Sequence, residues 1–323
     1  MKAFIVLNPA SGKNVTEPIR EALSRYFTSS QIDYEIYETS KEDKPGDIVR
    51  ARLSDHFDLV VAAGGDGTVS AVIDGLVGSS IPLGIIPVGT GNLIAHELNI
   101  PLEIADAVAL IAGAHKSRKI DAMRIGKRVY VLNASLGISA SIAGDTTSKN
   151  KSRFGRIAYL GTAILKIFTL RRHYLLVTVD GKALNYRAVE VAIFNCGILA
   201  NVLYPKGPDI RIDDGHLDVW IVSSKTLQDY PRYLLQMIIR RPAKNLSHFI
   251  SSEKSVSIRS SVPLPVQADG DIIGTTPVEV EVLSGALTVL VAEKPVSVSD
   301  HDLDPNKVMS QYLSGFTQTG RRK

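Results

Sequence analysis

The sequence of 323 residues contains a single cysteine, Cys196. One thiol can form neither an internal disulfide nor a multi-cysteine metal site, and such sparing use of cysteine is typical of a reducing compartment. No apolar run reaches the roughly 18 residues that a membrane-spanning helix needs. The sequence also lacks a Gly-x-Ser-x-Gly motif, and its seven histidines show no metal-ligand spacing. These absences disfavour a hydrolase, and we expect a cytoplasmic protein.

Two common nucleotide-binding fingerprints are missing as well. The first glycine-containing loop does not read Gly-x-x-x-x-Gly-Lys-Ser/Thr, and no Gly-x-Gly-x-x-Gly opens the first expected helix. An ordinary P-loop ATPase and a dehydrogenase that uses a nicotinamide dinucleotide are therefore disfavoured.

What the sequence does contain suits two globular domains. Apolar residues make up 45% and charged residues 22%, which is enough to bury substantial cores. In the first 125 residues, strand-like and helix-like segments alternate, which predicts parallel strands joined by crossover helices. The expected strands are Ala3–Leu7, Tyr34–Tyr37, Leu59–Ala63 and Leu83–Ile86; the expected helices are Glu17–Tyr26, Pro45–Leu53, Thr68–Leu76, Asn92–Leu98 and Glu103–Ala112.

The pattern changes after Asp121 to short apolar runs separated by Gly, Pro, Asn and Asp. The expected strands are Tyr130–Leu136, Leu175–Val179, Ala188–Phe194, Leu217–Val222, Ser255–Arg259, Val278–Val282 and Leu287–Val291, interrupted by helices near 154–170 and 227–239. We therefore expect a Rossmann-like three-layer α/β domain over 1–125 and a mostly antiparallel β-sandwich over 126–293. Residues 294–323 are polar and are expected to form a tail that is mobile or packs back on the first domain.

Three loops with glycines follow strands of the first expected domain. Asn8-Pro9-Ala10-Ser11-Gly12-Lys13 follows the first strand, Gly64-Gly65-Asp66-Gly67-Thr68 the third and Pro87-Val88-Gly89-Thr90-Gly91-Asn92 the fourth. Glycine lets backbone N–H groups approach phosphate oxygens, and the start of a helix favours an anion. Asp66 would repel a bare phosphate, so its useful role is to hold Mg²⁺ beside the phosphates. Each loop alone is a weak signal, but three at one sheet edge indicate a phosphate site.

With these loops and two later motifs, the chain resembles the catalytic domain of the diacylglycerol kinase and sphingosine kinase family, including its bacterial soluble members. The later motifs are Arg211-Ile212-Asp213-Asp214-Gly215-His216 and Ala268-Asp269-Gly270-Asp271, and the resemblance extends over roughly residues 1–293. It implies phosphorylation of a lipid hydroxyl by ATP, in particular of diacylglycerol to phosphatidic acid, with Mg²⁺. It also implies a nucleotide domain followed by a lipid domain.

The resemblance implies a role for each matching residue. ATP contacts are expected from Asn8, Ser11, Gly12, Thr39, Gly64, Gly65, Asp66, Gly67, Thr68, Thr90 and Asn92. Asp66 and Asp121 would arrange the catalytic Mg²⁺. A second, structural Mg²⁺ would be bound by the Asp214 carboxylate and by backbone carbonyls of Arg211 and His216.

Asp269 and Asp271 match the acid pair of the family's catalytic turn, one of which is the general base. A carboxylate within hydrogen-bond reach can take the proton of the attacking hydroxyl. Taken alone, Asp-Gly-Asp is also an ordinary β-turn sequence. The chain departs from the family pattern at Ser70-Ala71, where many members have Asn-Glu, at Leu93, where many have Asp, and at Asp271, where many have Glu.

Positive charge is concentrated in the second part of the chain. Residues 1–125 carry 12 Lys/Arg and 16 Asp/Glu, whereas residues 126–323 carry 25 and 17. Residues 149–173 contain seven Lys/Arg and no acid around an apolar centre, and Tyr230–Lys244 repeats this pattern. Such segments suit the surface of an anionic bilayer, although core helices with cationic ends share the pattern. We expect peripheral membrane contact through 149–173 and 229–244.

Other functions share parts of this pattern. An NAD kinase has the same Gly-Gly-Asp-Gly-Thr loop, but its pattern also uses an Asn-Glu pair that is absent here. Phosphofructokinase shares a similar loop but lacks the late Asp-Gly-acid turn. A catalytically inactive lipid-binding or regulatory module is a further alternative, suggested by Ser70-Ala71 and Leu93. No motif supports nucleic-acid binding, and a homodimer remains open.

Overall fold

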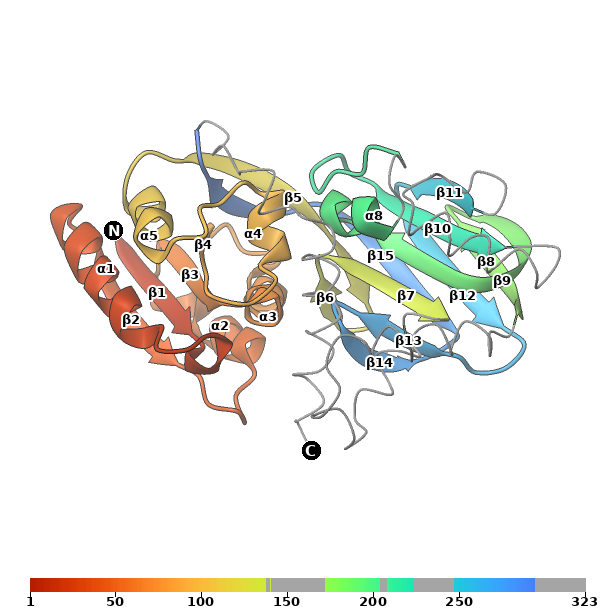
Figure 1. Ribbon diagram of the computed structural model, residues 1–323, viewed down its shortest axis with the longest axis horizontal. Coiled ribbons are helices and arrows are strands. Elements are labelled where there is room, and N and C mark those ends of the chain that lie inside the picture. Colours follow the sequence, from red (N-terminus) through yellow and green to blue (C-terminus); the bar gives the residue numbers. More distant parts are fainter. Residues whose placement is uncertain (138–139, 141–171, 204–207, 224–246, 294–323) are drawn as a thin grey trace, which may run out of the picture. The chain divides into compact units, whose positions relative to one another are not determined.

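A computed structural model of the chain describes residues 1–137, 140, 172–203, 208–223 and 247–293. The chain divides into two compact units (Figure 1). Of the described residues, the first contains Met1–Leu132, Ile212–Gly215 and 283–293, and the second contains those within Asn133–Arg211 and His216–Val282. The expected helices near 154–170 and 227–239, the basic segments up to residue 171 and over 229–244, and the tail 294–323 lie outside the described residues. The domain boundary near residue 125 stays a prediction.

The first unit is built on a sheet of parallel strands. Its strands are β1 (Lys2–Leu7), β2 (Asp33–Glu38), β3 (Leu59–Gly64), β4 (Leu83–Pro87), β5 (Lys116–Ile125), β6 (Arg128–Tyr130) and the later part of β15 (Val278–Val291). The order is β15-β4-β3-β1-β2, all parallel, while β5 pairs with β15 and β6. Every residue of β3 and β4 is buried, which is typical of a parallel sheet covered on both faces.

Helices cover both faces of this sheet (Figure 1). They are α1 (Thr16–Ser29), α2 (Pro45–Arg52), α3 (Asp66–Leu76), α4 (Leu93–Glu97) and α5 (Ile104–Ala112), with 3-10 turns η1 (Pro9–Ser11) and η2 (Leu53–Asp55). Helices α1 and α5 pack on the face formed by Ala3, Ile5 and Leu7 and the alternate residues of β3. Helices α2 and α3 pack together, and α3 contacts β3. The expected three-layer α/β architecture is confirmed.

The second unit consists mainly of antiparallel β-strands. They are β7 (Asn133–Gly137), β8 (His173–Val179), β9 (Lys182–Phe194), β10 (Leu217–Ser223), β11 (Ser247–Ser252), β12 (Ser255–Ser260), β13 (Pro265–Ala268), β14 (Asp271–Thr275) and the start of β15. The described residues of this unit also include helix α8 (Gly197–Leu203). The order is β14-β13-β7-β9-β8-β12-β15, and β10 joins β9 to β11. The first half of the long β9 pairs with β8 and its second half lies between β7 and β10. The expected antiparallel β-sandwich is confirmed.

Among the described residues, no helix is both long enough and apolar enough to cross a bilayer.

A single carboxylate fastens two turns of the second unit together. Asp180 and Gly181 form the hairpin turn between β8 and β9, both with positive φ. The Asp180 carboxylate accepts hydrogen bonds from the Ser252 hydroxyl at 2.8 Å and from the N–H groups of Glu253, Lys254 and Ser255 at 2.9, 3.0 and 3.0 Å. Desolvation alone would raise the pKa of Asp180, but these donors outweigh it and hold the pKa well below its usual range.

Replacing Asp180 by Ala is expected to destabilise the protein by about 1–3 kcal/mol at neutral pH, because four donors lose their acceptor. Since the folded-state pKa is depressed, the part of this stabilisation that depends on ionisation is present above the unfolded pKa of about 3.9 and is lost as the pH falls below it. Urea unfolding between pH 8 and pH 3 should therefore show the wild-type advantage shrinking only in acid. Glu279→Ala, which removes an exposed carboxylate of β15, should show no such loss; an Asp180→Ala difference that is constant with pH would contradict the assignment.

Candidate active site

The three glycine loops leave neighbouring parallel strands at the same edge of the first sheet. In register, Leu7 at the end of β1 lies beside Ala63 of β3, and Gly64 at the end of β3 lies beside Pro87 of β4. The carboxyl ends of parallel strands form the usual ligand-binding edge of such a sheet. The expectation that the loops share one edge is confirmed.

The first loop is hydrogen-bonded to the second. Asn8 directly follows β1, and its side-chain N–H donates to the Thr68 hydroxyl at 2.9 Å. The Asn8 amide oxygen accepts from the N–H of Ala10 at 3.0 Å, so the same side chain also caps η1. Thr68 is buried in the first turn of α3. Asn8 and Thr68 therefore fix the relative position of two loops that are 60 residues apart in sequence.

The second loop is hydrogen-bonded to the third through Asp66, the first residue of α3. Its carboxylate accepts from the N–H of Ile94, in the first turn of α4, at 3.0 Å. Within the third loop, Asn92 adopts a left-handed conformation with φ of 50°. Its side chain accepts from the N–H of Gly89 at 2.9 Å and donates to the Gly89 carbonyl at 3.0 Å. These bonds connect the second loop, the third loop and α4.

Glycine is required where the second and third loops touch. A Cβ on Gly89 would lie 2.5 Å from the Cα of Gly65. The two backbones are therefore closer together than any residue with a side chain at position 89 would allow. At Gly67, by contrast, a Cβ would meet nothing within 4 Å. The Gly67 N–H lies in the first turn of α3, where it has no intrahelical acceptor. An open, positively polarised helix start beside close-packed glycines suits a phosphate group.

The other expected nucleotide-contacting residues lie at the same edge. Thr39 follows β2 directly, is buried, and donates its N–H to the Leu7 carbonyl at 2.8 Å. Ser11 ends η1 and is half-buried, whereas Thr90 is exposed in the third loop. A Cβ on Gly12 would lie 2.8 Å from the carbonyl oxygen of Val88, so the first and third loops also approach closely. The structure thus brings the expected residues together; their contacts with ATP stay predictions.

Asp121 on β5 is buried and acts as an acceptor for two separate backbone segments. Its carboxylate accepts from the N–H of Gly215 at 2.6 Å and from the N–H of Gly285 at 2.7 Å. Its own N–H donates to the carbonyl of Ile212 at 2.7 Å. Asp121 therefore joins β5, the 212–215 turn and β15 within the first unit. A role for Asp121 near Mg²⁺ stays a prediction beside this structural role.

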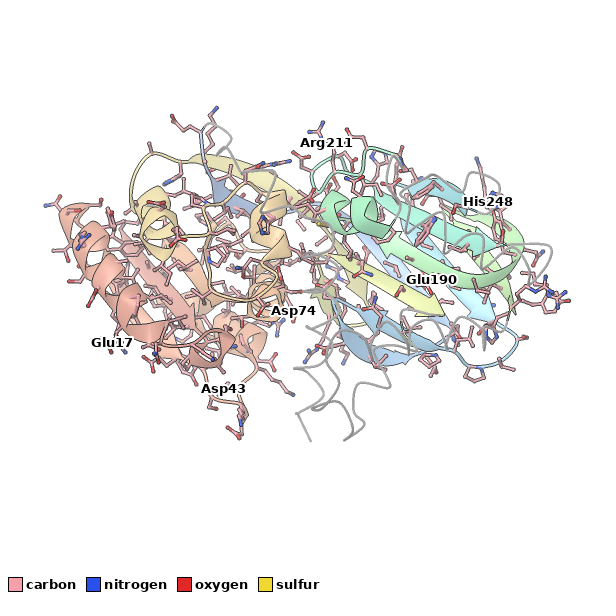
Figure 2. All side chains as sticks on the ribbon, viewed as in Figure 1. Glu17, Asp43, Asp74, Glu190, Arg211 and His248 are labelled. Atoms are coloured by element: carbon pink, nitrogen blue, oxygen red, sulfur yellow. The ribbon has the colours of Figure 1, made fainter. Side chains whose placement is uncertain are left out.

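The residues expected around a structural Mg²⁺ belong to one stretch, 211–216. Arg211, labelled in Figure 2, and Asp214 are exposed. Asp213 forms an ion pair with Arg118 at 2.8 Å, and the His216 ring lies 3.4 Å from the Glu253 carboxylate. In the part of the chain that the structure describes, no three His, Cys, Asp or Glu side chains are grouped as metal ligands. The expected site uses one carboxylate and two carbonyls, so it stays a prediction.

The acidic turn belongs to the second unit and forms the tip of the β13–β14 hairpin. Ala268 pairs with Asp271, so Asp269 and Gly270 are the two residues of the turn, with φ of 46° and 95°. Asp269 is tied to β7, because its N–H donates to the Asn133 carbonyl at 2.9 Å and its carboxylate accepts from the Asn133 N–H at 3.1 Å. Asp271 is exposed. One acid is therefore held in place and the other is open to solvent.

Sequence reasoning missed the polar residues that support this turn. The buried Gln267 bonds to Gly270 and to Ser135, and Asn133 bonds to Asp269. Apart from the turn, the sequence motifs also gave no sign of the buried carboxylate of Glu190 on β9, labelled in Figure 2, which is in register with Gly137 of β7. Asn133, Ser135 and Gln267 carry no motif of their own, and only the pairing of strands far apart in sequence brings them to the turn.

Together these features define a two-domain protein: an α/β domain with a three-loop edge suited to phosphate, and an antiparallel β-sandwich with an acidic hairpin. In the comparison with known proteins, two family models match successive parts of the chain. Residues 2–125 match the family model of the diacylglycerol kinase catalytic domain, and residues 133–291 match that of the YegS C-terminal NAD kinase beta sandwich-like domain. The first part of the chain is thus similar to the diacylglycerol kinase catalytic domain, and the second part to the YegS C-terminal domain.

Relatives match over most of the chain. A diacylglycerol kinase of Staphylococcus aureus is 27% identical over 282 residues, which cover 85% of this chain and 88% of the relative. An uncharacterized protein of Synechocystis is 28% identical over 300 residues, which cover 88% of this chain and 69% of the relative. The crystal structure of a diacylglycerol kinase from Bacillus anthracis is 22% identical, has a TM-score of 0.68 and matches 91% of this chain and 98% of that one. This last similarity supports the fold.

Proposed function

We propose that the chain is an ATP-dependent lipid kinase that phosphorylates a lipid hydroxyl, with diacylglycerol as acceptor and phosphatidic acid as product. The observation that carries the proposal is the hydrogen-bonded edge of the first unit, where Asn8 contacts Thr68 and Asp66 contacts the start of α4. The match of residues 2–125 to the diacylglycerol kinase catalytic domain and the relative named diacylglycerol kinase support the choice of acceptor.

The loops provide what a triphosphate needs. The N–H of Gly67 at the start of α3 is suited to a phosphate oxygen, and the contact of Gly65 with Gly89 fixes the loop backbone around it. In this proposal, Asp66 and Asp121 would hold the Mg²⁺ through their carboxylate oxygens, which are hard ligands, and the ion would neutralise the charge of the transferred phosphate. Most of the rate acceleration in such a site comes from positioning and from charge neutralisation.

The acidic turn provides the base of the proposed reaction. A lipid hydroxyl is a poor nucleophile at neutral pH, and the carboxylate of Asp269 or Asp271 would take its proton as the oxygen bonds to phosphorus. The proposal requires that this turn reach the terminal phosphate of bound ATP during transfer. We also propose that a structural Mg²⁺ is bound by the carboxylate of Asp214 and by the backbone carbonyls of Arg211 and His216.

An acceptor panel tests the function. The wild-type chain is incubated with ATP and Mg²⁺ and offered diacylglycerol in mixed micelles, a sphingoid base, or NAD. We expect turnover with diacylglycerol. Turnover with NAD alone would instead identify an NAD kinase-like enzyme, and tight lipid binding without any turnover would identify an inactive lipid-binding module.

We also propose that the protein contacts anionic membranes peripherally through residues 149–173 and 229–244, because both segments place basic residues around apolar ones. Co-sedimentation with vesicles should then require anionic lipid and weaken as salt is raised. Sedimentation that responds to neither would remove this part of the proposal.

A further inference from the structure

The β13–β14 hairpin presents its two acids on a turn that has little support of its own. Only Asp269 and Gly270 separate the paired residues Ala268 and Asp271. Glycine has more backbone conformational freedom than any other residue type. Asn133 fastens Asp269 by two hydrogen bonds. Nothing in that contact fixes Gly270, through which Asp271 is connected to Asp269.

The side chain of Gln267 fixes Gly270 from the strand that precedes the turn. Its side-chain oxygen accepts from the N–H of Gly270 at 3.0 Å, and its side-chain N–H donates to the Ser135 hydroxyl at 2.7 Å. Gln267 is 0% exposed, and it lies in register with Ser135 on β7. The amide therefore links the flexible residue of the turn to the interior of the sheet.

This arrangement is specific to an amide side chain. The Gly270 N–H donates to the side chain at position 267, and the Ser135 hydroxyl accepts from it. A neutral amide provides the required acceptor and donor in one rigid plane. An apolar residue of the same length would leave two polar groups without partners, which is costly in a buried site. A side chain so placed has no contact with solvent, so surface solubility does not explain it.

We propose that Gln267 is a positioning residue of the phosphoryl-transfer reaction: it holds Gly270 so that the carboxylates of Asp269 and Asp271 keep one geometry. The proposal rests on the proposed lipid kinase function. Gln267 itself is proposed to touch neither substrate and to act through the turn. Small displacements of a base cost rate because proton transfer requires hydrogen-bond distance in the transition state.

The test compares Gln267→Met with Ser135→Ala. Methionine keeps the length and volume of glutamine but removes both hydrogen bonds, and we expect kcat to fall about 10-fold with the KM for ATP unchanged. Ser135→Ala removes one bond and should lower kcat less. Because both variants break the same link, the double variant should be no worse than Gln267→Met, whereas independent effects would multiply.

Thr276→Val is the matched control. Thr276 is also buried, and its hydroxyl accepts from the N–H of Leu264 at 2.9 Å at the opposite end of the same hairpin. It should lower the unfolding midpoint comparably without a separate loss of kcat measured below that midpoint. Equal kcat losses in Thr276→Val and Gln267→Met would show that general loosening of the hairpin, rather than positioning, is responsible.

A measurement without turnover separates this inference from the function on which it rests. Amide hydrogen exchange at Gly270, followed by NMR, should be faster in Gln267→Met than in the wild type and unchanged in Thr276→Val. Unchanged exchange at Gly270 would overturn the role of Gln267 whatever the activity. A wild type that turns over no lipid would instead overturn the proposed function, and with it the catalytic significance of the link, while faster exchange would still establish the link itself.

Discussion

In at least one of the variants Asp269→Asn and Asp271→Asn, kcat is expected to fall by a factor of about 10²–10⁴ while the protein remains folded. Asparagine matches aspartate in shape and tolerates the left-handed conformation of residue 269, and its side-chain oxygen can still accept from the N–H of Asn133. A loss in Asp269→Asn would therefore report the missing negative charge rather than a broken turn. Initial rates with diacylglycerol and saturating ATP measure the effect.

The two variants also decide which acid is the base. Asp269 is fixed by Asn133 and Asp271 is exposed, so the two carboxylates differ in freedom to follow a lipid hydroxyl. Glu279→Gln removes an exposed carboxylate from β15 and should leave kcat unchanged. If Asp269→Asn and Asp271→Asn both retained full activity, neither carboxylate would be the base and the proposed mechanism would fail.

The fold was predictable where sequence periodicity matches burial. The strands ending at Leu7, Gly64 and Pro87 are continuous apolar runs because both faces of the parallel sheet are covered. A strand that is buried on both faces cannot be mistaken for a loop. The glycine turns that follow are equally visible, so the edge at which the loops meet followed from the sequence alone.

Strands that expose residues to solvent, or that pair with different strands along their length, were harder to predict. Strand β5 reads Lys-Ser-Arg-Lys before its buried half, so no strand was expected over Lys116–Ile125. The expected strands Val278–Val282 and Leu287–Val291 form one strand, β15. Gly285, with φ of 57°, lies between them, and its N–H donates to the side-chain carboxylate of Asp121 on the neighbouring strand β5. Such a kink reads in the sequence as a turn.

The contacts that organise the candidate site could not be predicted, because they join residues far apart in the sequence. Asp66 was expected to act through Mg²⁺, and nothing in its motif indicates that its carboxylate also accepts from Ile94. Likewise, Asp-Asp-Gly at 213–215 reads as a turn, but the ion pair of Asp213 with Arg118 requires the folded sheet. The residue types indicated which side chains could take part in the reaction. The hydrogen bonds and ion pairs that hold those side chains in place depend on how distant segments pair in the folded protein.

Gly67→Ala is expected to weaken ATP binding by about 10- to 100-fold without destabilising the protein. A Cβ at this position meets no protein atom within 4 Å, and alanine is a better helix former than glycine in the first turn of α3. The unfolding midpoint should therefore stay the same or rise. The new methyl group would occupy the space from which the Gly67 N–H reaches a phosphate oxygen. Calorimetric titration with ATP, together with thermal unfolding without ligand, measures both quantities.

Gly89→Ala makes the contrasting control. Its Cβ would lie 2.5 Å from the Cα of Gly65, so the second and third loops must separate, and both the unfolding midpoint and the affinity for ATP should fall. The pair distinguishes space that a ligand needs from space that the fold needs. Wild-type ATP affinity in Gly67→Ala would mean that the phosphates do not bind at the start of α3, and the proposed nucleotide site would have to be abandoned.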